Sequence, residues 1–355
     1  MVFQFHQIES GQLAEDCGGS PGREDEERAM DVVFSGVQPT GKMHIGNYLG
    51  AISLWVRNQH RYRNFFCIVD LHALTIPENI DPRELRQNSF DAAALYIACG
   101  IDPKQSVIFI QSQVKQHTEL AWLLNCVTPM GWMNRMTQFK VKSKSAETIG
   151  VGLYDYPVLQ ASDILLYQTN LVPVGEDQRQ HIEITQDIAQ RFGNLFGDVF
   201  TIPQVLVQKV GARIMGLDDP TAKMSKSSKN DKHAINLLDD ENTILKKVRS
   251  AKTDSQIAVD VTNMSPGVRN LVDIYHAFEG GDYHATLRHF DGASYGRLKT
   301  EVGERVAAGA PIQERYRSLR NDQSALEAIV NSSAEMAREV AETTMVRVRK
   351  AIGTF

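Results

Sequence analysis

The sequence predicts a doubly wound parallel α/β sheet followed by a helical domain. Continuous apolar runs at 32–34, 64–70 and 106–111 are typical of strands buried on both faces, and helical segments separate them. Strands and helices that alternate in this way form a parallel sheet with helices on both faces. From residue 239 onward only helical segments follow, which predicts a second, all-helical region.

The composition is that of a globular protein. Hydrophobic residues make up 42% and charged residues 23% of the 355 residues, and no apolar run is long enough to span a membrane. The four cysteines lack the spacing of a metal site, so we expect reduced thiols. Residues 1–30 hold seven acidic residues against two arginines and so account for the whole formal charge of -5. The neutral remainder neither supports nor excludes a nucleic-acid partner.

Residues 1–29 are expected to form a disordered extension. They combine a glycine-rich stretch at 18–22 with an acidic run at 24–27 and show no apolar period. An organellar transit peptide would be rich in arginine and poor in acids, and this segment is the reverse. We therefore expect a cytoplasmic protein, with an organellar one left open, and Met30 is an alternative start.

The segment from Gln38 to Asn47 lies between the first strand and a helix expected from Tyr48 to about His60. The first N–H groups of a helix lack intrahelical partners and favour anions. His44 and Asn47 are three residues apart, so both side chains can point at one anion. This pattern predicts a phosphate site; ordinary turn chemistry with a capping histidine is the alternative.

The remaining elements of the sheet region are predicted from apolar runs bounded by caps, glycine or proline. They are the strands 64–70, 106–111 and 171–175, and the helices 81–100, 115–126 and 155–168 and one that opens at 176–178. Open α/β sheets bind ligands at the carboxyl ends of their strands, which directs attention to Leu71–Thr75.

A polar face marks the helix expected from about Asp155 to Gln168. Tyr156, Gln160, Asp163 and Tyr167 would project from one side of it, although their neighbours are apolar and would bury the helix. A buried carboxylate without a partner is costly. Two explanations stay open: an internal network closed by an arginine from elsewhere, or an Asp163 carboxylate that accepts a hydrogen bond from an aromatic amino acid.

Lysines gather in two segments. Lys140, Lys142 and Lys144 follow Arg135, and a second group lies in the polar stretch 218–231, which has no period and predicts a mobile surface loop. Solvent-exposed charge is the ordinary explanation for such clusters.

Helices account for the rest of the chain, and they end in a basic segment. They are predicted at 239–250, 266–278, 283–290, 295–308, 312–320 and 324–351. The predicted organisation is an extension at 1–29, a sheet domain at 30–222, a lysine loop at 223–231, a helical domain at 232–325 and a C-terminal helix at 326–355 that can pack back on the sheet domain.

Two segments carry a family resemblance. His44-Ile45-Gly46-Asn47 resembles the HIGH signature of class I aminoacyl-tRNA synthetases, and Lys223-Met224-Ser225-Lys226-Ser227 resembles their KMSKS signature. The stretch from Val172 to His181, Val-Pro-Val-Gly-Glu-Asp-Gln-Arg-Gln-His, is similar to the bacterial-type tryptophanyl-tRNA synthetase family. The resemblance extends from about Val32 to Phe355 and implies a Rossmann-like, HUP-type sheet with a helical anticodon-binding domain.

This resemblance implies a ligase that activates L-tryptophan with ATP and Mg²⁺ and transfers it to tRNA-Trp, in a homodimer. The residues it assigns to catalysis are His44, Asn47, Lys142, Lys223 and Lys226. Those it assigns to ATP are Gln38, Pro39, Thr40, Gly46, Asn47, Gly175, Glu176, Asp177, Ile214, Lys223, Met224, Ser225, Lys226 and Ser227. Those it assigns to tryptophan are Phe34, Gly36, His72, Tyr156, Gln160, Asp163, Val172, Val174 and Gln178. No protein ligand to a metal is implied.

Two other functions stay open on the sequence. A small-molecule adenylyltransferase of the same superfamily would account for the first signature, but such enzymes lack the lysine loop and the long helical C-terminal part. A non-catalytic paralogue would keep the fold and lose phosphate ligands, whereas this chain keeps them. Amino-acid-dependent exchange of pyrophosphate into ATP separates the three.

Overall fold

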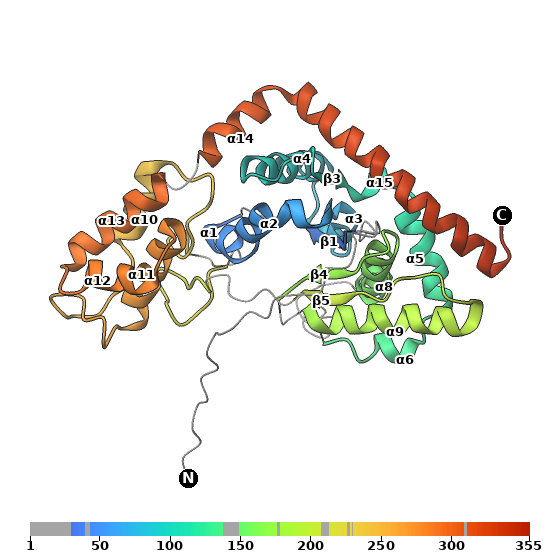
Figure 1. Ribbon diagram of the computed structural model, residues 1–355, viewed down its shortest axis with the longest axis horizontal. Helices are drawn as coiled ribbons and strands as arrows, with labels where there is room; N and C mark the ends of the chain where they lie inside the picture. Colours follow the sequence, from blue (N-terminus) through green and yellow to red (C-terminus); the bar gives the residue numbers. More distant parts are fainter. Residues whose placement is uncertain are drawn as a thin grey trace, which may run out of the picture. The chain divides into compact units, whose positions relative to one another are not determined.

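The computed structural model describes residues 30–39, 43–137, 149–175, 178–206, 213–225, 228, 230–308 and 311–355, and within them five parallel strands form one sheet (Figure 1). The strands are β1 (Val32–Val37), β2 (Arg63–Ile68), β3 (Ser106–Ile110), β4 (Leu171–Pro173) and β5 (Gln204–Leu206). Their order is β3-β2-β1-β4-β5, so it reverses direction between β1 and β4. Open α/β sheets bind ligands at such a reversal, outside the carboxyl ends of the strands.

Helices cover both faces of the sheet. They are α1 (Ile45–Asn47), α2 (Ser53–Asn58), α3 (Asp70–Ala73), α4 (Pro82–Ala98), α5 (Gln116–Val127), α6 (Met130–Met133), α8 (Val151–Leu165) and α9 (Arg179–Phe196). A π-helical turn at Tyr48–Ile52 joins α1 to α2, and short 3-10 turns occupy Gln59–Arg61, Pro77–Asn79 and Gln111–Gln113.

Two apolar cores lie on opposite faces of the sheet because side chains alternate along each strand. Phe66 and Ile68 of β2 belong to the core that contains the buried side of α4. Phe65 and Cys67 belong to the core that contains α5, α8 and α9. Asp81 caps α4 by accepting a hydrogen bond from the Arg83 backbone N–H, as its position before Pro82 predicts. The parallel sheet with helices packed on both faces confirms the predicted doubly wound arrangement.

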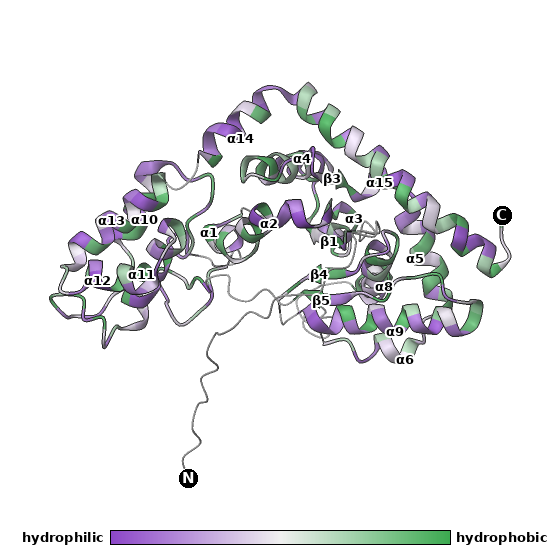
Figure 2. Cartoon of the chain, viewed as in Figure 1, coloured by the Kyte–Doolittle hydropathy of each residue, from purple (hydrophilic) through white to green (hydrophobic). Residues whose placement is uncertain are grey.

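The C-terminal region is helical, as predicted. Its helices are α10 (Glu241–Arg249), α11 (Pro266–Glu279), α12 (Tyr283–Phe290), α13 (Tyr295–Ala308), α14 (Ile312–Asn321) and α15 (Gln323–Ile352). Hydrophobic and hydrophilic residues alternate along α9 and α15, so each helix has one apolar side (Figure 2). Buried residues from both regions share one core, and residues 31–355 form a single unit.

The long helix α15 returns to the sheet region, where it lies against β3 and α5 (Figure 1). Arg349 forms two parallel hydrogen bonds with the Glu119 carboxylate of α5, at 2.7 and 2.8 Å. It also pairs with Glu342 at 2.6 Å, about two turns earlier on its own helix. A forked guanidinium–carboxylate pair fixes orientation as well as distance, so the end of α15 has a defined register on α5.

Three elements differ from the sequence predictions. The first helix begins at Ile45 rather than Tyr48, so part of the first signature already lies in its first turn. Helix α8 begins at Val151, which puts Pro157 in its interior rather than in its first turn. That proline cannot donate to the carbonyl of Leu153, and burial of this part of the helix offsets the loss. Strand β5 was not predicted, because three residues are too few to show a period.

Other expectations concern single features. Cys67, Cys99 and Cys126 are free thiols. None of the helices within the described ranges has the length and hydropathy needed to cross a bilayer. The extension expected at 1–29 lies outside the described residues.

Candidate active site

A cavity of about 310 Å³ lies at the carboxyl ends of β1 and β4, where the strand order reverses. All nine residues that the resemblance assigns to tryptophan line it, together with Gln38 from the set assigned to ATP. The complete lining is Phe34, Ser35, Gly36, Gln38, Val69, His72, Tyr156, Gln160, Asp163, Ile164, Val172, Pro173, Val174 and Gln178. The structure therefore brings together side chains from five separate stretches of the sequence.

Regular structure explains this convergence. Alternate residues of a strand point to the same face, so Phe34 and Gly36 of β1 both reach the cavity. Helix α8 supplies Tyr156, Gln160 and Asp163, which lie four and three residues apart on one side of the helix. The spacing seen in the sequence thus places one acid and two neutral polar groups along one wall of the cavity.

Asp163 is the most deeply buried polar residue of the cavity, with 1% of its surface exposed. Its Oδ1 accepts a hydrogen bond of 2.6 Å from Gln111 Nε2 and lies 2.6 Å from His117 Nδ1. Its Oδ2 lies 2.8 Å from His72 Nε2. Each carboxylate oxygen can accept two hydrogen bonds. Three of these four positions are filled by protein, and the position that remains is on Oδ2.

The pKa of Asp163 lies below its usual value. Burial by itself raises the pKa of this carboxyl group, but hydrogen bonds from His117 and His72, together with their favourable electrostatic interaction, lower it by more. The side chain is therefore a carboxylate at neutral pH, and a carboxylate can only accept hydrogen bonds.

Two parts of the sequence interpretation of this helix are wrong. Among the residues that the structure describes, histidine and glutamine side chains, and not an arginine, supply the donors of this network. Tyr167 does not share the cavity wall with Asp163, because α8 ends at Leu165. It lies behind the wall instead, where its ring stacks on Phe34 at 5.6 Å and on Phe65 at 4.5 Å.

Tyr156 is oriented from outside the cavity by α9. Its hydroxyl lies 2.8 Å from His181 Nε2, and both residues are buried. Burial raises the pKa of Tyr156 to about 12, so the phenol keeps its proton at neutral pH. The phenol can donate this proton to a neutral His181, and its oxygen is a hydrogen-bond acceptor on the cavity wall.

The first signature begins a helix and is packed against the chain that follows the lysine segment. His44 is the N-cap of α1 and is 4% exposed, and Asn47 Oδ1 accepts from the His44 backbone N–H at 3.1 Å. Residues on either side of His44 pair with residues 235–237: Ile45 N–H donates to Ile235 O, and Leu237 N–H donates to Met43 O. The oxygen of the Asn47 amide group thus accepts the capping hydrogen bond, and its NH₂ group is the donor that could face a ligand.

The start of the lysine segment lies beside this helix. A Cβ added at Gly46 would be 3.7 Å from the Cβ of Ile214. Ile214 O in turn accepts from Met224 N–H, and Met215 forms an antiparallel bridge with Lys223. Met224 is only 2% exposed, so the prediction of a surface loop is wrong at this residue. The two signatures, distant in sequence, are neighbours in the fold.

Several residues assigned by the resemblance lie outside the described ranges. They are Thr40, Lys142, Glu176, Asp177, Lys226 and Ser227. Of the other residues assigned to ATP, Pro39 and Gly175 directly follow Gln38 and Val174, which line the cavity.

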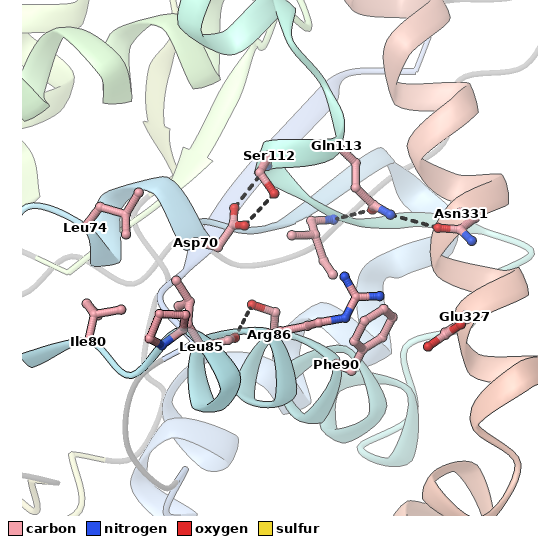
Figure 3. A pocket seen from close by; sticks show the side chains of 13 residues that line it. Asp70, Leu74, Ile80, Leu85, Arg86, Phe90, Ser112, Gln113, Glu327 and Asn331 are labelled. Atoms are coloured by element: carbon pink, nitrogen blue, oxygen red, sulfur yellow. Dashed lines mark hydrogen bonds between the residues drawn. The ribbon is translucent and has the colours of Figure 1, made fainter. Parts of the chain in front are cut away.

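A second cavity of about 310 Å³ lies at the carboxyl ends of β2 and β3, between α4 and α15 (Figure 3). Asp70 points into it and accepts hydrogen bonds from the backbone N–H and hydroxyl of Ser112, at 3.0 and 2.5 Å. Arg86 lies over the ring of Phe90, with 5.6 Å between the guanidinium carbon and the ring centre. Asp70 and His72 are thus two residues apart on α3 and face different cavities.

Sequence reasoning missed the residues that support the site from behind. Three buried residues contact cavity residues from outside: Gln111 in the turn after β3, His117 of α5 and His181 of α9. Each follows an ordinary helix or strand pattern, and its partner is between 25 and 52 positions away. No local signal in the sequence reveals such a contact.

The fold and the position of the cavity define a doubly wound α/β protein with a candidate ligand site at its strand reversal. The comparisons narrow this class: the chain belongs to the family of class I tRNA synthetases (W and Y), whose model matches residues 26–308.

Curated relatives agree with the family. Tryptophan–tRNA ligases of Helicobacter pylori and Wolinella succinogenes are each 50% identical over 90% of this chain and 98% of their own length. Among solved structures, the tryptophanyl-tRNA synthetase of Campylobacter jejuni, in complex with ADP and tryptophan, matches with a TM-score of 0.80. It is 38% identical, and the match covers 91% of this chain and 100% of that one.

Proposed function

We propose that this chain is a tryptophan–tRNA ligase that activates L-tryptophan with ATP and then transfers it to tRNA-Trp. Relatives of that name, 49–50% identical over 98% of their length, support the assignment. The structural observation that carries it is the buried Asp163 carboxylate, which has one acceptor position left on Oδ2 in a cavity walled by Phe34, Val172 and Val174.

The cavity would hold the amino acid. Asp163 Oδ2 accepts the indole N–H, and the apolar wall contacts the faces of the ring. Tyr156 and Gln178 hold the ammonium group with their oxygens, and Gln160 and His72 complete the polar side. A site that receives an N–H rejects an analogue without it, because the buried acceptor would then be left unpaired.

ATP would lie between the cavity and the first signature. Gln38, Pro39, Thr40, Gly46 and Asn47 follow the carboxyl end of β1 and open α1, where helix N–H groups favour phosphate. Gly175, Glu176 and Asp177 follow β4, and Ile214 packs against Gly46. A carboxylate oxygen of tryptophan bonds to the α-phosphorus, the bond to the bridging oxygen breaks, and pyrophosphate leaves.

Lysines would stabilise the departing pyrophosphate. Lys223, Met224 and Ser225 begin the segment beside α1, and Lys226 and Ser227 continue it. With Lys142 and His44 they supply positive charge and hydrogen-bond donors where negative charge develops, which is the main requirement of phosphoryl transfer.

Mg²⁺ would be bound mainly by substrate. Within the described ranges no three His, Cys, Asp or Glu side chains converge on a point that could hold a metal ion. Mg²⁺ in nucleotide sites commonly keeps most of its waters and is held by phosphate oxygens, so it does not require such a cluster of protein ligands. The ion neutralises phosphate charge, and the lysines act beside it.

Three further assignments follow from the family. The ribose hydroxyl of tRNA-Trp attacks the carbonyl carbon of the adenylate, and AMP leaves. We infer a homodimer, and a cytoplasmic setting on the strength of the bacterial relatives. Sedimentation velocity tests the dimer directly.

The deciding experiment is exchange of labelled pyrophosphate into ATP, run with tryptophan, tyrosine or no amino acid. We expect exchange with tryptophan that exceeds exchange with tyrosine by several orders of magnitude. Exchange without any amino acid would favour a different nucleotidyltransferase, and no exchange under any condition would favour a non-catalytic paralogue. Charging of tRNA-Trp transcripts then tests the second step.

A further inference from the structure

We infer that His117, which lies outside the cavity, is a positioning residue that aims the Asp163 carboxylate at the ring N–H of the substrate. The inference rests on the proposed function and deepens it, because it assigns selectivity for tryptophan to a side chain that does not touch tryptophan.

The carboxylate is held asymmetrically. Oδ1 has both of its acceptor positions filled, by His117 Nδ1 and Gln111 Nε2, each at 2.6 Å. Gln111 cannot rotate freely, because its Oε1 accepts from the Leu71 backbone N–H at 3.2 Å. Oδ2 has one protein partner, His72 Nε2. Saturation of Oδ1 leaves Oδ2 as the oxygen that can accept from a ligand.

With a neutral His117 ring, the protons in this chain of contacts have one consistent arrangement. His117 Nε2 lies 2.8 Å from the hydroxyl of Tyr167, and its Nδ1 faces the carboxylate. Since a carboxylate only accepts, Nδ1 carries the proton. A neutral ring then has Nε2 as acceptor, so Tyr167 donates to it. Burial raises the pKa of Tyr167, which keeps the phenol as this donor.

Tyr167, at the end of this chain of contacts, is held in place by packing. Tyr167 is 1% exposed and stacks between Phe34 and Phe65. The backbone of His117 is also held, since Ser162 Oγ donates to its carbonyl oxygen at 2.7 Å. Two consecutive residues of α8 therefore hydrogen-bond to His117: Ser162 to its main chain and Asp163 to its side chain.

Protonation of Asp163 would remove the acceptor. Besides its two histidine partners, the titratable groups that interact with Asp163 are Cys67 of β2 and Tyr167. Burial raises the pKa of both groups, so both stay neutral and neither places a negative charge beside the carboxylate. Burial raises the pKa of Asp163 and the hydrogen bond from His117 lowers it, so loss of this donor would raise the pKa of Asp163.

The test compares two substitutions of similar size. His117→Asn keeps an N–H donor near the position of Nδ1, whereas His117→Leu removes it. We expect the KM for tryptophan in pyrophosphate exchange to rise about 10- to 100-fold in His117→Leu, as for a lost hydrogen bond to a buried charge. The kcat should change less than about threefold, and His117→Asn should stay within about threefold of wild type.

Selectivity supplies a readout that general damage to the fold would not change. The probe is 3-(3-benzothienyl)alanine, in which sulfur replaces the indole N–H with nearly the same shape. His117→Leu should lose most of the preference for tryptophan over this analogue. As pH falls, the KM for tryptophan should also begin to rise at a higher pH in His117→Leu than in wild type, because the pKa of Asp163 is higher without the His117 donor.

A milder pair covers the case in which His117→Leu does not fold. Tyr167→Phe removes only the hydroxyl that donates to His117, and Tyr96→Phe removes one from a tyrosine in the other core. Tyr167→Phe should reduce the preference over the analogue roughly three- to tenfold, and Tyr96→Phe should not. An unchanged preference in both His117→Leu and Tyr167→Phe would overturn the inference. Wild type without tryptophan-dependent exchange would instead refute the proposed function.

Discussion

Asn270 of α11 holds both backbone polar groups of Met215. The Met215 N–H donates to Asn270 Oδ1 at 2.9 Å, and Asn270 Nδ2 donates to the Met215 carbonyl oxygen at 3.0 Å. Asn270 is 4% exposed, and Met215 in turn bridges to Lys223. A single amide in the helical region therefore fixes the chain from which the lysine segment extends.

Asn270→Ala should lower the free energy of unfolding by about 1 to 3 kcal/mol, because both hydrogen bonds between the buried amide and the Met215 backbone would be lost. It should also lower kcat in pyrophosphate exchange, since Lys223 depends on the position of Met215. Urea unfolding and exchange kinetics measure the two effects. Asn263→Ala, at an exposed position just before the same helix, is the control. Equal stability of the two variants would contradict the argument.

Asp163→Ala should reduce the selectivity for tryptophan over phenylalanine by a larger factor than it reduces turnover. A site built around one N–H discriminates by roughly 10⁴ to 10⁵ against substrates that lack it. We expect the ratio of kcat/KM for tryptophan over phenylalanine to fall by about 10² or more. Asp155→Ala, on the same helix but away from the cavity, controls for damage to α8. A ratio that survives in Asp163→Ala would show that another group recognises the ring.

Lys226→Ala should lower turnover by on the order of 10² to 10³ and leave the affinity for tryptophan nearly intact, because its charge is needed as pyrophosphate departs. Single-turnover kinetics and tryptophan titration separate the two quantities. Lys232→Ala removes an exposed lysine just after the same stretch and should behave as wild type. Equal losses in turnover and affinity would place Lys226 in ground-state binding instead.

The stability of the protein should depend on pH through Asp163. The pKa of Asp163 in the folded state lies below its ordinary value of 3.8, so its contribution is fully present above that pH. The contribution is lost as pH falls through 3.8 toward the folded pKa. Urea unfolding of wild type and Asp163→Asn from pH 6 to pH 3 should show a difference in free energy that shrinks with acidity. Other carboxyl groups titrate in both proteins and cancel in the comparison.

Local patterns were enough for most helices. Tyr283–Phe290 and Tyr295–Ala308 have the bounds expected from their period and caps, and α4 begins at its predicted cap. Prediction failed where packing overrides a local rule. Pro157 suggested a helix start, yet the helix runs back to Val151, and Leu153 of the added turn is buried in the core. Strand β5 exists only because β4 offers a partner edge.

The candidate site also has features that local patterns predicted and features that only the folded structure shows. Spacing on α8 indicated that Tyr156, Gln160 and Asp163 share a face, because that relation is set by the period of a helix. The partners of Asp163 could not be read in advance. They come from α3, α5 and the turn after β3, and only the folded chain brings these segments to one carboxylate.

The sequence by itself determined the doubly wound fold, the two signatures and the polar face of α8, since each depends on residues that are neighbours along the chain. Only the tertiary structure decided that the signatures adjoin and which oxygen of Asp163 remains for a ligand. Those outcomes depend on contacts between segments far apart in sequence, whose hydrogen bonds are formed when the core excludes water.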